Sequence, residues 1–216
     1  MTFKCERIMK ITAMPLLLFC SLFLSHCKKP ISPPLTPDQA LETFQLADEN
    51  LKMELVASEP MVQDPVAIAF DEGGRLWVAE MLGFMQDIDG TGEEDRIGRI
   101  SVLFDDDGDG TMDRRQTFLD SLILPRSLAI VKGGALVAEN MPLWYVSDTD
   151  GDFIADNKIL IYSLFGGLGV PEHSANGLFL GMDNWLYNAK SKYRYKKIGN
   201  EWVKNETEFR GQWGIC

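Results

Sequence analysis

The sequence predicts an all-β fold, an incomplete β-propeller of about three to four blades that follows an exported N-terminal leader. After residue 51, short apolar runs recur between Gly, Asp and Asn residues, and this cadence is typical of antiparallel strands. A strand–turn–strand unit is repeated three times, and radial repeats of about four strands are the signature of a propeller. The alternative that these patterns leave open is a β-sandwich or a meander with similar hairpins.

Residues 1–27 have the features of a signal peptide with a lipobox-like end. Lys4, Arg7 and Lys10 form a basic region, and the apolar stretch 11–24 is shorter than the ~20 residues that a membrane span needs. Cys27 closes the leader and is the expected lipidation site, with His26 in place of the small residue that usually precedes such a cysteine. We therefore expect a periplasmic or cell-surface lipoprotein held by a lipid anchor in the membrane. Plain secretory cleavage nearby is the alternative.

A Pro-rich tether over residues 28–37 separates the leader from the folded part, residues 38–216. Thr36 and Gln39 flank Pro37 in the pattern of a capping box, which predicts a short helix that runs to Phe44.

The composition excludes several classes of protein. The formal net charge of −11 opposes binding to nucleic acid and to anionic membrane surfaces. Three of the cysteines, Cys5, Cys20 and Cys27, lie in the leader, and Cys216 is the last residue. The folded part therefore has no internal disulfide framework and no Cys-x-x-Cys-His haem site.

The expected strands follow the apolar runs, and a Gly199-Asn200 pair signals a two-residue hairpin turn. These strands are Val66–Phe70, Leu76–Glu80, Arg99–Phe104, Leu128–Val131, Ala135–Glu139, Leu143–Ser147, Lys158–Ser163, Leu178–Leu180, Trp185–Ala189, Tyr193–Ile198 and Glu201–Lys204.

The three copies of the repeated unit are residues 65–80, 125–139 and 175–189. Their apolar anchors Leu76, Leu136 and Leu186 lie 60 and then 50 residues apart. At this period the chain offers about three and a half blades, whereas closed propellers have ~4–8. The sequence stops in an apolar stretch, so we expect it to be the N-terminal part of a longer protein.

Two acidic segments resemble calcium-binding loops. Asp side chains at loop positions 1, 3, 5 and 9 offer the hard oxygen ligands that Ca²⁺ requires, and a Gly at position 6 permits the sharp turn. The first segment has this Gly, whereas the second has Phe153 in its place. Position 12 of the first is Gln116 rather than Glu, and solvated Asx-rich turns are the alternative. The candidate ligands are Asp105, Asp107, Asp109, Thr111 and Asp113 in the first, and Asp148, Asp150, Asp152 and Asp156 in the second.

His173 is the one histidine outside the leader, and its ordinary pKa suits proton transfer near neutral pH. Glu172 precedes it and could orient it, so the pair is a candidate catalytic site, with a structural histidine as the alternative. Asn176, Arg126 and Arg210 are candidates for binding a cofactor.

Glu80 and Glu139 end matching strands of two repeats. We interpret them as ordinary charges at strand ends, with equivalent positions around a channel as the alternative.

A resemblance to a known family rests on segments that extend over nearly all of the mature chain. Residues 172–187 resemble the histidine-containing hairpin of the soluble glucose/sorbosone dehydrogenases, with Glu172 where that family has Asp. The chain more closely resembles the membrane-bound dehydrogenases of Planctomycetes, Verrucomicrobia and Bacteroidetes. The segments that carry this second similarity are 64–71, 74–81, 107–110, 172–177 and 210–215.

The resemblance implies part of an exported dehydrogenase of the pyrroloquinoline quinone (PQQ) type that acts on a sugar or polyol. It implies His173 as the base, Ca²⁺ and PQQ as cofactors, and a cytochrome c as electron acceptor. The alternatives are a non-catalytic lipoprotein propeller that binds glycan or protein, and a truncated inactive product.

Overall fold

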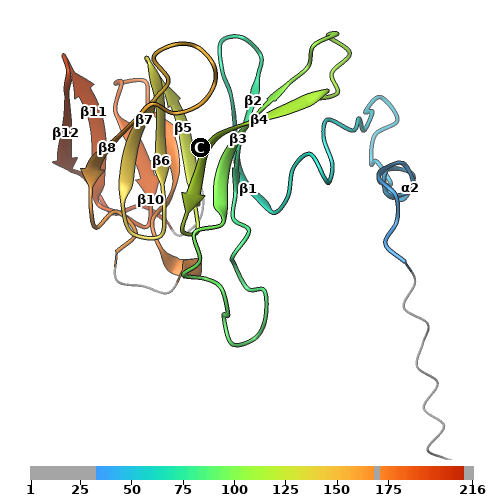
Figure 1. The fold of residues 1–216 in the computed structure, drawn as a ribbon, viewed down its shortest axis with the longest axis horizontal. Coiled ribbons are helices and arrows are strands. Elements are labelled where there is room, and N and C mark those ends of the chain that lie inside the picture. The colour runs from blue at the N-terminus through green and yellow to red at the C-terminus, as the bar shows by residue number, and fades with distance from the viewer. Residues whose placement is uncertain (1–32, 168–170, 212–216) are drawn as a thin grey trace, which may run out of the picture. The chain divides into compact units, whose positions relative to one another are not determined.

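In the computed structural model, which describes residues 33–167 and 171–211 without the side chain of Glu172, three four-stranded antiparallel sheets follow one another along the chain (Figure 1). Each is a meander in which neighbouring strands in sequence are neighbours in space. We call them blades 1, 2 and 3. Blade 1 consists of β1 (Pro65–Phe70), β2 (Leu76–Glu80), β3 (Gly98–Phe104) and β4 (Arg114–Leu122); blade 2 of β5 (Ser127–Val131), β6 (Gly134–Ala138), β7 (Leu143–Ser147) and β8 (Asn157–Tyr162); blade 3 of β9 (Asn176–Leu180), β10 (Leu186–Ala189), β11 (Tyr193–Ile198) and β12 (Glu201–Glu206).

The first strands of the blades lie side by side, β1 beside β5 and β5 beside β9. This is the arrangement of a β-propeller, whose innermost strands surround a central axis. The described blades do not close a ring, so the fold is an incomplete all-β propeller, as the sequence predicts.

The three first strands run in the same direction. Val66, Ser127 and Asn176, where these strands begin, line one cavity, while Phe70, Val131 and Leu180, where they end, line another. We call the first end of the blades the start face and the second end the turn face, since the β1–β2, β5–β6 and β9–β10 turns lie there.

The helix α2 (Pro37–Leu41) belongs to a separate unit, residues 1–43, and confirms the predicted capping box. The Gln39 backbone N–H donates to Thr36 Oγ1 over 3.3 Å, and the Thr36 N–H donates to Gln39 Oε1 over 3.0 Å. The helix ends at Leu41, before the predicted Phe44, and it buries none of its residues.

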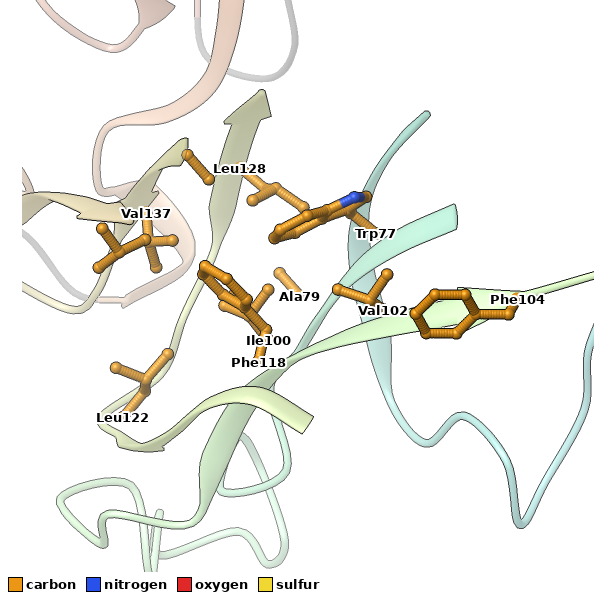
Figure 2. Close-up of a cluster of buried hydrophobic side chains, with 11 residues drawn as sticks. Trp77, Ala79, Ile100, Val102, Phe104, Phe118, Leu122, Leu128 and Val137 are labelled. Atoms are coloured by element: carbon orange, nitrogen blue, oxygen red, sulfur yellow. The ribbon is translucent and has the colours of Figure 1, made fainter. Parts of the chain in front are cut away.

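Blades 1 and 2 share a hydrophobic core. Figure 2 shows the side chains of Trp77, Ile100, Phe118 and Leu128 turned toward one another across the gap between the two sheets. Trp77 meets Phe118 edge to face, with ring centroids 4.6 Å apart. Alternate residues of a strand point to opposite faces, which is why β2 presents Trp77 and Ala79 to blade 2 but Leu76 and Val78 to the other side.

Blade 2 is buried on both faces because blade 3 covers its second side. Ala135 and Val137 of β6 face blade 1, while Leu136 and Ala138 pack with Tyr195 and other residues of blade 3. The continuous apolar run of β6 is therefore a consequence of its position between two sheets.

The outer side of blade 1 is partly covered by the segment that precedes β1. Ala57, Met61 and Val62 pack on Leu76, Val78, Leu103 and Met112. The Met112 N–H donates to the Val56 carbonyl over 2.8 Å, which fixes this segment to the blade.

Glu80 and Glu139 are more than ordinary strand-end charges, because both side chains are buried. Glu80 accepts hydrogen bonds from Arg99 at 2.7 and 2.8 Å, from the hydroxyl of Ser101 and from the Gln63 N–H. Burial alone would raise the pKa of Glu80, but these hydrogen bonds outweigh it and hold the pKa below its ordinary value.

Glu139 takes the same position in blade 2. It accepts from Lys158 Nζ at 2.6 Å and from the Ile123 N–H at 3.1 Å. Each glutamate thus ties the segment that precedes its blade to the sheet, which confirms that the two positions are equivalent.

The predicted strands are confirmed to within a few residues, and the Gly199-Asn200 hairpin is confirmed by the Ile198–Glu201 pair. β4, the longest strand among the described residues, was not predicted; its nine residues include two arginines, a glutamine and an aspartate. As the outermost strand of blade 1 it buries only Phe118 and Leu122, so it lacks an apolar run.

No helix in residues 33–167 or 171–211 combines the length and apolar character of a membrane span. The predicted leader and Cys27 lie outside the described residues.

We expect Glu80→Gln to lower the free energy of unfolding by about 3 kcal/mol at neutral pH, because it leaves Arg99 without its carboxylate partner in a largely buried position. Since the folded-state pKa of Glu80 is depressed, its contribution is present at neutral pH and is lost as pH falls through that pKa. The difference between wild type and variant should therefore shrink below about pH 4. Urea unfolding followed by tryptophan fluorescence, at neutral pH and below about pH 4, measures this difference in the free energy of unfolding.

The matched control is Glu54→Gln, which removes an exposed carboxylate paired with Lys52 and should change stability by less than about 0.5 kcal/mol. Equal unfolding midpoints for the two variants would show that the buried pair has no structural role.

Candidate functional site

The start face holds a cavity of about 430 Å³ between the first strands of all three blades. Its walls are largely apolar, and Arg126, Ser127 and Asn176 supply polar groups. These three residues are buried. A concave, mostly apolar cavity with a few convergent polar groups is the usual form of a small-molecule site.

Arg126 joins two loops at this cavity. Its Nη1 donates to the Pro171 carbonyl over 2.8 Å, and its Nη2 donates to Asn140 Oδ1 over 2.9 Å. The guanidinium therefore sets the position of the segment before β9 relative to blade 2.

His173 lies at the same face, at the end of the 3-10 helix η2 (Pro171–His173), whose Pro171 lines the cavity. The imidazole is exposed, whereas Ser174 and Asn176, which follow it, are buried. Asn176 Nδ2 donates to the Ser174 carbonyl over 3.0 Å, and this contact fixes the chain between His173 and β9. The structure thus brings the His173 segment, Arg126 and Asn176 together; the side chain of Glu172 lies outside the described residues.

Arg210 is placed elsewhere. It follows β12, its guanidinium lies 4.3 Å from the centre of the Tyr187 ring, and its Nη2 donates to Thr207 Oγ1 over 2.7 Å. Arg210 does not line the start-face cavity.

Sequence reasoning missed the cavity residues Ser127, Met81 and Phe84. Ser127 Oγ accepts from the Leu178 N–H at 2.9 Å and links β5 to β9. No local pattern marks these residues, because they become neighbours only when the blades pack.

The acidic segments form the β3–β4 and β7–β8 loops, which both lie at the turn face, at the top of Figure 1. They are the same hairpin of successive blades, at the opposite end of the blades from His173.

The two acidic loops share one hydrogen-bond pattern. The first Asp of each loop, Asp105 or Asp148, accepts backbone N–H groups from loop positions 4 and 6 at 2.7 and 2.9 Å. The Asp at position 9, Asp113 or Asp156, accepts the N–H of position 2 at 2.7 or 2.6 Å. The Thr111 backbone N–H donates to Asp109 Oδ1 over 2.7 Å, and in the second loop the Ile154 backbone N–H donates to Asp152 Oδ1.

Carboxylates gather in each loop. Asp105, Asp107 and Asp109 each present an oxygen within 4.8 Å of the others, and so do Asp148, Asp150 and Asp156. The N–H groups of Asp150, Gly151 and Phe153 outweigh the effect of burial and lower the pKa of Asp148. At Asp150 the Asp152 N–H lowers the pKa, but the negative charges of Asp152, Asp156 and Asp148 outweigh it and the pKa is raised. Three oxygen ligands of this kind fit Ca²⁺, and Asx turns without a metal use the same hydrogen bonds.

Packing between blades explains why position 6 of the second loop is Phe153 rather than glycine. Its backbone is left-handed, with φ of 62°, as is that of Gly110 with φ of 93°. Its ring meets Phe104 of blade 1 edge to face at 5.1 Å, and the Arg75 guanidinium lies 4.6 Å from its centre. The strain of a non-glycine residue at positive φ is offset by packing between blades.

The start-face cavity combines apolar and polar side chains. Leu128 and Leu178 belong to its apolar wall, while Arg126 and Asn176 contribute a guanidinium and an amide.

The chain also matches a known family. The model of a family described as "Domain of unknown function (DUF7133)" matches residues 36–213, which is more than half of the chain. No curated protein matches the sequence.

We expect Phe153→Gly to be more stable than Phe153→Ala by about 1 kcal/mol, although glycine is the smaller residue. Both variants lose the ring contacts, and both should be less stable than wild type by about 2 kcal/mol or more. Only glycine relieves the left-handed backbone. Thermal unfolding of the two variants measures the difference, and Gly110→Ala, the reverse change in the other loop, should destabilise by about 1 kcal/mol. If the alanine variant is as stable as the glycine variant, the backbone at position 6 is not strained.

Proposed function

The chain belongs to the DUF7133 family, and we propose that it forms part of an exported dehydrogenase that oxidises a sugar or polyol at the start face. The observation that supports this proposal is the convergence of the His173 segment, Arg126 and Asn176 at one cavity. The leader and Cys27 would carry the protein out of the cytoplasm and anchor it in the membrane as a lipoprotein.

In this proposal His173 is the general base. Oxidation of an alcohol removes a proton from oxygen and a hydride from carbon, and the C–O single bond becomes a carbonyl. A neutral imidazole accepts the proton at a ring nitrogen, and the exposure of His173 to solvent lets it pass that proton to water. The role of Arg126 is to hold η2, and therefore His173, against the cavity.

The cofactor proposed for the start face is PQQ, held by Arg126 and Asn176. When bound, PQQ supplies the two-electron acceptor for the hydride. A cytochrome c is the proposed acceptor for the electrons that leave the reduced cofactor.

Ca²⁺ is the metal that we propose for the acidic loops, with Asp105, Asp107 and Asp109 as ligands in one and Asp148, Asp150 and Asp156 in the other. Because both loops lie at the turn face, these ions would stabilise hairpins and would not contact a substrate at the start face.

His173→Ala should lower the rate of dye-linked oxidation of sugars or polyols, with added PQQ and Ca²⁺, by about 100-fold or more. Because His173 is exposed, its removal should leave the midpoint of thermal unfolding unchanged. Glu201→Gln, an exposed change on β12, is the control that should retain full activity. Unchanged turnover in His173→Ala would exclude the base, and glycan binding without any turnover would favour the non-catalytic lipoprotein instead.

Isothermal titration with Ca²⁺ should show two sites per chain, and Asp107→Asn should remove one of them by taking a charged ligand from the first loop. Bound Ca²⁺ should also raise the midpoint of thermal unfolding, because the folded state alone forms the loops. Asp106→Asn is the matched control: Asp106 lies beside the ligands but pairs with Arg114 at 2.7 Å, so both sites should remain. Absence of any heat up to about 10 mM Ca²⁺ would leave the loops as plain Asx turns.

A further inference from the structure

The turn face holds a second and larger cavity, of about 860 Å³, which the proposed dehydrogenase reaction does not use. It opens between the β1–β2, β5–β6 and β9–β10 turns, so all three blades contribute to it. Its volume lies near the upper end of the range for small-molecule sites, which suits a ligand of several rings rather than a single ion.

Cationic side chains outnumber carboxylates among the lining residues, four against three, in a chain whose net charge is −11. Lys132, Lys196 and Lys197 line it, and among the described residues none of the three forms an ion pair; the lysines that do are Lys52, Lys158 and Lys192.

The acidic residues of this wall are largely engaged elsewhere. Asp71 is bonded to Arg75 and to Trp77 Nε1, and Asp148 accepts the N–H groups of its own loop. Glu72 also lines the cavity. Arg75 is paired with Asp71, so the three lysines are the cations of this wall that form no ion pair among the described residues, and they can attract an incoming anion.

Tyr145 holds two of these lysines in place. Its hydroxyl donates to the Gly133 carbonyl over 2.9 Å, which fixes the turn that carries Lys132. Its ring lies 4.2 Å from Lys197 Nζ and 5.6 Å, between centroids, from the ring of Trp202. A turn of blade 2 and two strands of blade 3 thus meet at one buried tyrosine.

The turn that bears Lys132 admits no larger residue at its second glycine. A Cβ atom on Gly134 would lie 2.0 Å from the Val146 carbonyl oxygen, and Gly133 has a positive φ of 81°. The turn beside Lys132 therefore requires glycine at both positions.

The remaining wall is aromatic and apolar. Phe70 is 60% exposed and Leu180 is 56% exposed, and Trp202 also lines the cavity. Aromatic faces pack against the C–H faces of sugar rings, whereas a small inorganic anion gains nothing from them.

From this combination we propose that the turn face binds an acidic oligosaccharide, with uronate carboxylates at Lys132 and Lys197 and sugar rings on Phe70 and Trp202. The site is separate from the proposed catalytic site, since it lies at the other end of the blades.

The test is calorimetric titration of the full chain with tetragalacturonate, in EDTA so that Ca²⁺ cannot bridge carboxylates. Binding should weaken about tenfold in the double variant Lys132→Gln, Lys197→Gln, and it should weaken when NaCl rises from about 20 to 200 mM. Tyr145→Phe should lower affinity several-fold through the loosened turn.

The control double variant, Lys52→Gln with Lys192→Gln, removes the same charge from exposed positions outside the cavity and should bind as wild type does. The proposal is overturned if tetragalacturonate does not bind, if both double variants lose affinity equally, or if neutral maltotetraose or sulfate binds as well as the uronate. His173→Ala should bind tetragalacturonate normally, so that failure of the catalytic proposal and failure of this site can be distinguished.

Discussion

The packing of one sheet against the next is the constraint on which the rest of this structure depends. A four-stranded sheet has two faces, and successive side chains of a strand point to opposite faces. In β2 and β6 this alternation places apolar side chains on the face that packs against the following blade. Blade 2 is the clearest case, since Ala135 and Val137 face one neighbour and Leu136 and Ala138 the other. The stacking brings the first strands side by side and so creates a cavity at each end of the blades.

The polar groups inside this arrangement serve the same packing. Glu80 and Glu139 are buried only because each is bonded to a cation of its own sheet and to a backbone N–H of the segment before it. The same holds for Phe153 in the β7–β8 loop. Its unfavourable backbone conformation persists because the Phe153 ring packs beside Phe104.

The two ends of the blades differ in chemistry. The start face combines one buried arginine with Asn176 and the His173 segment, whereas the turn face combines lysines, aromatic rings and the acidic hairpin loops. Sequence reasoning found the acidic loops, His173, Arg126 and Asn176, because each stands out in a local pattern. Lys132, Tyr145, Lys197 and Trp202 carry no such signal, and β4 escaped notice because an outermost strand buries few residues.

What the sequence determined by itself was local: the alternation of the strands, the capping box at Thr36, the hairpin at Gly199 and the loop pattern from Asp105 to Asp113. These features depend on residues close together in the chain, whose backbone preferences and hydrogen bonds need no distant partner. Tertiary structure alone decided that the acidic loops and His173 lie at opposite ends of the blades, and that Arg126 lines the start-face cavity whereas Arg210 does not. It also decided that Tyr145 contacts residues of two blades. The reason is that sheet-on-sheet packing joins residues dozens of positions apart, and no local pattern records which faces will meet.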